Sequence, residues 1–143
     1  MNKTLATLLV LAAGALALVF ARELFHAETP VGGPNDAAQV EEGFKVAVAR
    51  LRPMLPKKID AATTLRDVSS ARMVLTYHYV VDSDNYDLQP NFMQTAQRVT
   101  TTLVCNTQDM RSAMKVGAVY EYKYSDGSSK PLGGFVVTSA DCG

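Results

Sequence analysis

The sequence of 143 residues predicts an α+β fold: an N-terminal hydrophobic helix, then a small domain with a mostly antiparallel sheet and helices on one face. Three observations lead to this prediction. The chain opens on an uncharged apolar run. Later segments switch between the helical spacing of apolar residues and the period of two that strands show. In the small domain these segments follow in the order helix, strand, strand, helix, helix, strand, strand.

The composition excludes several functions. Lys plus Arg and Asp plus Glu each total 14, so the formal net charge is zero. A nucleic-acid-binding protein would need a basic excess for its phosphate contacts, and a disordered chain would carry more net charge. With two His, two Cys and no Trp, the chain has little material for a metal site or a histidine-dependent active site. We therefore predict no enzyme, no metal, no cofactor and no nucleic-acid partner.

The N-terminal apolar run is predicted to be an export segment. Residues 4–21 carry no charge, and 16 of residues 1–21 are hydrophobic. Lys3 before the run keeps the N-terminus in the cytoplasm. Cleavage after Ala21 would make the run a signal peptide, which we favour slightly, whereas an uncleaved run would be a signal anchor in the inner membrane. No cysteine near the end of the run is available to accept lipid, which argues against a lipoprotein.

The export segment sets the predicted location and the domain boundaries. The folded domain is expected in the periplasm, either soluble after cleavage or anchored through residues 4–21. In that oxidising compartment Cys105 and Cys142 are predicted to form a disulfide that ties the end of a helix to the last strand. The predicted divisions are a signal peptide or signal anchor over residues 1–21, a Pro- and Gly-rich linker over residues 22–35, and the α+β domain over residues 36–143.

Three helices are predicted in the domain. The first begins at Asp36, a good N-cap, and is ended by Pro53. Pro90 suits the first turn of the second helix. The third is capped by Thr107 and stopped by Gly117. The apolar stripes are Val40, Phe44, Ala47, Val48 and Leu51 on the first helix, and Phe92, Ala96, Val99 and Leu103 on the second.

Four strands are predicted, joined in pairs by turns. Ser69-Ser70 is the expected turn of the first pair, and Asp126-Gly127 is a strong hairpin signal for the second. Gly133-Gly134, at the start of the last strand, suggests a bulge or a close approach of two backbones. The strands are expected over residues 63–68, 72–82, 119–124 and 132–138.

Tyrosine side chains form the most suggestive pattern. Five of them recur at period two on two predicted strands, so they share one sheet face if those strands pair. We favour a core in which helices cover this face. The alternative is an exposed aromatic platform that binds a partner. The residues are Tyr77, Tyr79, Tyr120, Tyr122 and Tyr124.

The opposite sheet face is mixed polar and is the candidate binding face. His78 lies mid-strand on this face, but no motif supplies a nucleophile, so it is interpreted as a strand histidine and not as a catalytic base. The acidic loop after Asp82 does not match a calcium loop, because Asp87 and Met93 stand where Gly and Glu are required. The candidate binding residues are Thr76, His78, Glu121, Lys123, Val136 and Thr138.

Two resemblances accompany these patterns. The chain resembles small, largely uncharacterised exported proteins of Gram-negative bacteria over residues 55–142, which implies a periplasmic location and a disulfide. The element order with its disulfide also resembles the α/β type of type II secretion pilotin. Pilotins of that type are lipoproteins, whereas this chain has no lipid-accepting cysteine. The first resemblance rests on residues 55–60, Thr64-Leu65, Tyr77-His78-Tyr79, Cys105, Met110-Arg111, Gly117, residues 122–124, Asp126-Gly127 and residues 138–142.

Three functional hypotheses follow. The favoured one is a non-enzymatic periplasmic binding or assembly module whose partner is an envelope protein. The alternative is an inhibitor or immunity protein against an envelope-targeting toxin or hydrolase, which would share the export, the small size and the disulfide. The third is a small hydrolase that uses His78 or the loop after Asp82.

Overall fold

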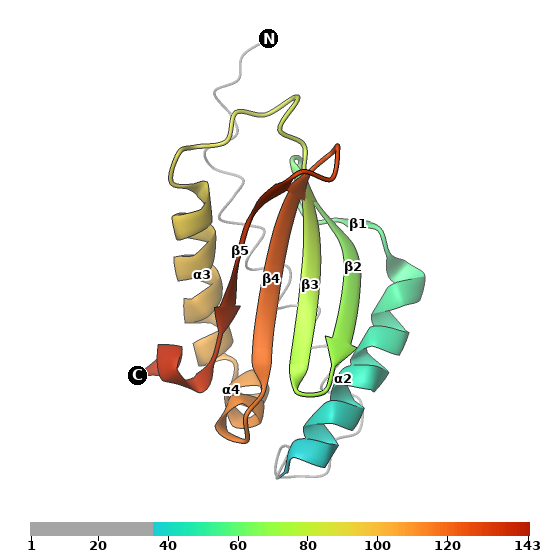
Figure 1. Ribbon diagram of the computed structural model, residues 1–143, viewed down its shortest axis with the longest axis vertical. Helices are drawn as coiled ribbons and strands as arrows, with labels where there is room; N and C mark the ends of the chain where they lie inside the picture. The colour runs from blue at the N-terminus through green and yellow to red at the C-terminus, as the bar shows by residue number, and fades with distance from the viewer. Residues whose placement is uncertain (1–35) are drawn as a thin grey trace.

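The computed structural model describes residues 36–143, which form a five-stranded sheet with helices packed on one face (Figure 1). The strand order is β1-β2-β3-β4-β5, and only the central β3–β4 pair is parallel. The predicted α+β class and mostly antiparallel sheet are confirmed. The expected N-terminal helix and linker lie outside the described residues. Within residues 36–143 no helix has both the length and the hydropathy that a membrane crossing requires.

The first described helix, α2, spans Ala37–Leu51 and matches its predicted pattern. The Asp36 carboxylate accepts a hydrogen bond from the Gln39 backbone N–H at 2.9 Å, as expected of an N-cap. Pro53 then lies in η2, a short 3-10 helix over Arg52–Met54. All predicted stripe residues are buried: Val40, Phe44, Ala47, Val48 and Leu51.

The first strand pair is longer than predicted. β2 spans Thr63–Ala71 and β3 spans Val74–Val81, so the prediction of a turn at Ser69-Ser70 is wrong. Ser69 instead pairs with Thr76 inside the ladder. The chain reverses after β2 at Arg72, whose φ of 53° supplies the left-handed conformation that this tight turn uses. The sequence also gave no sign of β1, the two-residue edge strand Lys57–Lys58.

The helical connection between β3 and β4 contains α3, Phe92–Asn106, and α4, Gln108–Lys115. Such a crossover is what a parallel strand pair requires. Gly117, with a φ of 104°, follows α4 as predicted. Thr107 occupies the N-cap position of α4, but its hydroxyl donates to the Leu103 carbonyl at 2.8 Å and does not cap the helix. The buried stripe of α3 also differs from the prediction, since it consists of Phe92, Ala96, Thr100 and Val104.

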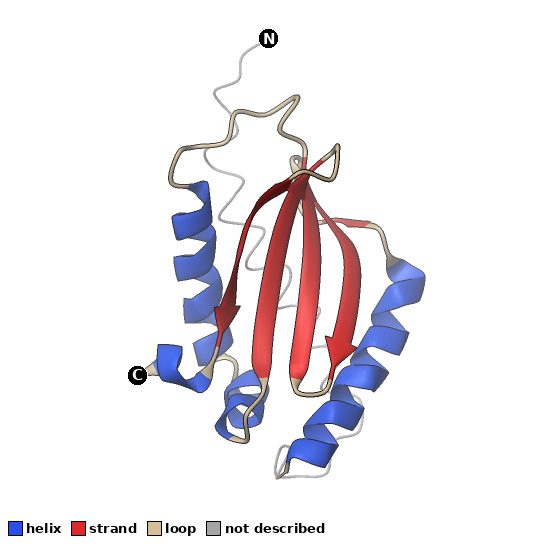
Figure 2. Ribbon diagram, in the orientation of Figure 1, coloured by secondary structure: helices blue, strands red, loops and turns tan. Residues whose placement is uncertain are grey.

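The C-terminal hairpin is formed by β4, Val119–Asp126, and β5, Pro131–Val137, and is followed by the 3-10 helix η3, Ser139–Cys142 (Figure 2). The disulfide between Cys105 and Cys142 is present, with Cα atoms 5.2 Å apart. It joins the end of α3 to η3, and not to the last strand as expected, because β5 ends before the cysteine. The disulfide therefore holds the C-terminal segment against α3.

Candidate binding face

The tyrosine face of the sheet lies under the helices. Tyr77 stacks on Tyr122 with ring centroids 5.2 Å apart, and Tyr79 stacks on Tyr124 at 5.1 Å. Phe44 of α2 meets Tyr120 edge to face. The five tyrosines are between 0% and 6% exposed, so they form core and not an exposed platform. Burial raises the pKa of all five phenols, because the phenolate is poorly solvated there.

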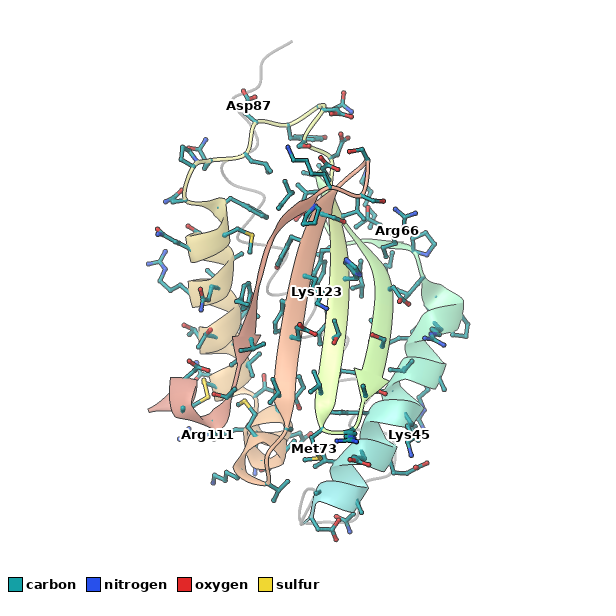
Figure 3. All side chains as sticks on the ribbon, in the orientation of Figure 1. Lys45, Arg66, Met73, Asp87, Arg111 and Lys123 are labelled. Atoms are coloured by element: carbon teal, nitrogen blue, oxygen red, sulfur yellow. A yellow bond between two sulfur atoms is a disulfide. The ribbon has the colours of Figure 1, made fainter. Side chains whose placement is uncertain are left out.

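Among residues 36–143 no helix covers the other side of the sheet, and we call its side chains at the sheet centre the open face. The register aligns them in two rows across the strands. One row runs from Asp67 through His78 to Lys123, and the other from Thr76 through Glu121 to Val136. Figure 3 shows Lys123 over the sheet centre and Arg66 beside β2. The open face consists of Asp67, Thr76, His78, Glu121, Lys123 and Val136.

Thr138 is not part of the open face. It follows the last residue of β5, and its hydroxyl and backbone N–H lie 2.9 and 2.8 Å from the Asp141 carboxylate in a capping box of η3. The prediction assumed that the strand alternation continues to Thr138. Because β5 ends at Val137, Thr138 is instead the N-cap of η3, and its side chain caps that helix.

Polar side chains on and beside the open face contact one another. Glu121 accepts a hydrogen bond from the Thr76 hydroxyl at 2.8 Å, and its other oxygen lies 3.4 Å from the Lys123 ammonium. The Asp67 carboxylate lies 4.0 Å from the Arg52 guanidinium, which comes from η2. Solvent screens such exposed pairs, so each contributes at most about 1 kcal/mol to stability. The same groups are accessible donors and acceptors for a partner.

A β-bulge extends the polar surface of β2. The register of β2 against β3 shifts between Leu65 and Asp67, which leaves Arg66 as the extra residue. Arg66 and Asp67 are consequently both exposed, although they are neighbours in a strand. A bulge re-aims side chains in this way. Arg66 lines two shallow hollows on this side of the sheet, of about 440 and 630 Å³.

Sequence reasoning missed Arg66 and Asp67. The signal was present: Leu65 and Val68 are both buried but stand three residues apart, which a regular strand does not allow. Two charged residues between two core residues thus indicate a bulge. Only the partner strand shows which residue is the extra one.

Asp82, at the start of the acidic loop after β3, is paired within the loop. The Asp82 carboxylate accepts hydrogen bonds from the backbone N–H of Asn85 at 3.2 Å and from its side-chain amide at 3.0 and 2.9 Å. Among residues 36–143 no group of three or more His, Cys, Asp or Glu side chains is arranged to hold a metal ion. His78 is exposed between Asp67 and Lys123 on the open face. This arrangement offers binding groups at an accessible surface.

The fold and this face define a class of protein: a small disulfide-stapled α+β domain with one sheet face under helices and one sheet face open. Solved structures with this fold include the type II secretion pilotin EpsS from Vibrio vulnificus, with a TM-score of 0.64 and 18% identity, covering 75% of this chain and 94% of that one. The pilotin AspS from Vibrio cholerae has a TM-score of 0.59 and 16% identity, covering 74% and 94%.

A third similar structure is that of a predicted secreted protein from Pseudomonas aeruginosa. Its TM-score is 0.65 at 13% identity, and the match covers 78% of this chain and all 100% of that one. No family model matches this sequence, and no curated protein matches it. The expected resemblance to pilotins is therefore confirmed at the level of the fold.

Proposed function

We propose that this chain is a non-enzymatic binding or assembly module of the bacterial envelope, which holds an envelope protein on its open face. The observation that carries this proposal is the asymmetry of the sheet. One face is filled by stacked tyrosines and helices, whereas the other presents Thr76, His78, Lys123 and the 47% exposed Val136 to solvent. A rigid sheet with accessible polar and apolar groups is suited to hold another protein.

The likeness to pilotins supports the same role. EpsS and AspS are pilotins of type II secretion systems and share this fold over most of their length. The apolar run over residues 4–21 supports export, with the domain either released into the periplasm or tethered to the inner membrane. The inhibitor or immunity alternative stays a prediction, with a toxin-encoding neighbouring gene as its test.

Site-specific photo-crosslinking in intact cells tests the proposed function. A photoreactive residue would replace Val136 on the open face or Val46 on α2, two valines that are similarly exposed at 47% and 40%. We expect Val136 to give a discrete covalent adduct with an envelope protein, since it lies on the surface that holds the partner. Val46 should give none. Equal adducts from both positions, or adducts from Val46 alone, would contradict a partner on the open face.

A further inference from the structure

A groove made of two adjoining hollows lies on the same side of the sheet as the open face and includes Asp67, His78 and Lys123 of that face. The two hollows both include Arg66 and Asp67 in their linings, so they adjoin there. One extends from this point to Leu55 and Pro56 after η2, and the other to Pro131 at the start of β5. Figure 3 shows Arg66 and Lys123 on either side of β3. We call this surface the cross-strand groove.

The cross-strand groove carries an excess of positive charge. Its lining contains the cations Arg52, Arg66 and Lys123 and one carboxylate, that of Asp67. Asp67 lies 4.0 Å from the Arg52 guanidinium, and Glu121, beside the lining, lies 3.4 Å from the Lys123 ammonium, so these two cations are already paired. Within the described part of the chain, no ion pair or hydrogen bond is formed by the Arg66 side chain. Lys58, an exposed residue of β1, is the strand partner of the lining residue Thr64.

Apolar side chains also line the groove. Leu55, Pro56 and Val80 line one half, and Pro131 lines the other. Strands in a sheet lie about 4.8 Å apart, so a path across β2–β5 measures roughly 14 Å, which is about four residues of extended chain. A lining that combines cations with apolar side chains over this length fits a peptide segment better than a single small anion.

From these observations we propose that the cross-strand groove binds an extended segment of the partner that is rich in Asp and Glu and carries apolar residues between them. This inference rests on the proposed function and names the partner chemistry of the same side of the sheet. Arg66 and Lys123 pair with carboxylates, and the carboxylate of Asp67 accepts a backbone N–H of the segment. A polyphosphate chain has no N–H donor for the Asp67 carboxylate, which favours the peptide.

Fluorescence anisotropy with a defined probe tests the inference. The full-length protein, purified from the envelope, would be titrated into a labelled synthetic peptide of alternating Glu and Val. We expect Arg66→Glu and Lys123→Glu each to weaken binding about tenfold, equivalent to about 1.4 kcal/mol. Arg98→Glu on α3 and Lys115→Glu on α4 reverse exposed charges outside the groove, so they should change affinity less than about twofold. Circular dichroism would confirm that every variant is folded.

Several outcomes would overturn the inference. If a peptide with Gln in place of Glu bound equally well, the groove would not recognise carboxylates. If Arg98→Glu lowered the affinity for the Glu-Val peptide as much as Arg66→Glu does, the peptide would not be bound specifically in the groove. Vesicles of phosphatidylglycerol that bind in an Arg66-dependent way, while the peptide does not, would indicate a lipid surface. Because crosslinking at Val136 does not depend on peptide charge, adducts there together with failed peptide binding would refute only the acidic segment.

Discussion

Gly134 shows how tightly single residues constrain this sheet. It lies on β5 opposite Lys123, and a Cβ atom at this position would come within 2.7 Å of the Tyr122 carbonyl oxygen. Real Cβ atoms do not approach a backbone oxygen so closely, and the backbone of a central strand cannot shift cheaply. The Gly133-Gly134 pair indicated a bulge or a close approach, and the structure shows both. The register against β4 shifts between Gly133 and Pro131, whereas the close approach of the two backbones is at Gly134.

Alanine at this position should be destabilising. We expect Gly134→Ala to lower the free energy of unfolding by about 1–3 kcal/mol, because β5 must move away from β4. Gly127→Ala in the β4–β5 turn is the matched control, since a Cβ there meets no atom within 4 Å. Urea unfolding followed by circular dichroism measures both. Equal stability of the two variants would show that β5 accommodates the extra methyl group.

At the scale of elements, local periodicity predicted helices better than it predicted their buried sides. Phe92 and Ala96 lie on the expected stripe of α3, but Thr100 and Val104 replace Val99 and Leu103 farther along. The C-terminal half of α3 packs against α4 and η3 as well as the sheet, so its buried side rotates. A stripe calculated for a helix on one surface cannot anticipate two further contacts.

The disulfide between α3 and η3 should contribute substantially to stability. Its cysteines are 37 residues apart, and closing a loop of this length restricts the unfolded chain by about 4 kcal/mol. Reduction, or replacement of Cys105 and Cys142 by Ser, should lower the free energy of unfolding by a comparable amount in urea titrations. The double-serine variant is its own control, because reductant should not affect it further. A loss below about 1 kcal/mol would mean that packing alone holds η3.

At the scale of the whole molecule, the tyrosine core makes stability depend on alkaline pH. The folded-state pKa of each core tyrosine lies above its ordinary value of 10.0 because burial disfavours the phenolate. Above pH 10 the unfolded chain therefore releases protons that the folded chain retains. The stabilisation by these neutral phenols is fully present below pH 10 and is lost as the pH rises toward the folded pKa values.

Replacing one buried phenol should reduce this alkaline sensitivity. The hydroxyls of Tyr79 and Tyr120 are buried without a hydrogen-bond partner in the described part of the chain. We expect Tyr120→Phe to keep or raise stability at neutral pH, by up to about 1 kcal/mol, and to flatten the decline above pH 10. Tyr86→Phe, in the loop after β3, should leave the decline unchanged. Urea midpoints measured across the alkaline range would refute this if Tyr120→Phe declined as steeply as the parent.

Much of the candidate site could be predicted, because its residues lie on well-patterned strands. Alternation along β3 and β4 placed Thr76, His78, Glu121 and Lys123 opposite the tyrosines, and the structure places them there. Arg66 could not be placed by the same reasoning, since its exposure depends on a bulge against β3. Whether the open face binds a partner stays a prediction until the crosslinking and peptide experiments are done.

Patterns along the chain were enough to predict the helices, the main strands, the tyrosine stripe and the cysteine pair. These features depend on spacing along the chain, and hydrophobic periodicity is a local property. Contacts between distant segments were needed to establish that β3 and β4 pair in parallel, that Thr138 is the N-cap of η3, and that Arg66 and Lys123 line one hollow. Register, bulges and crossovers join segments distant in sequence, so their energies depend on partners that no single segment contains.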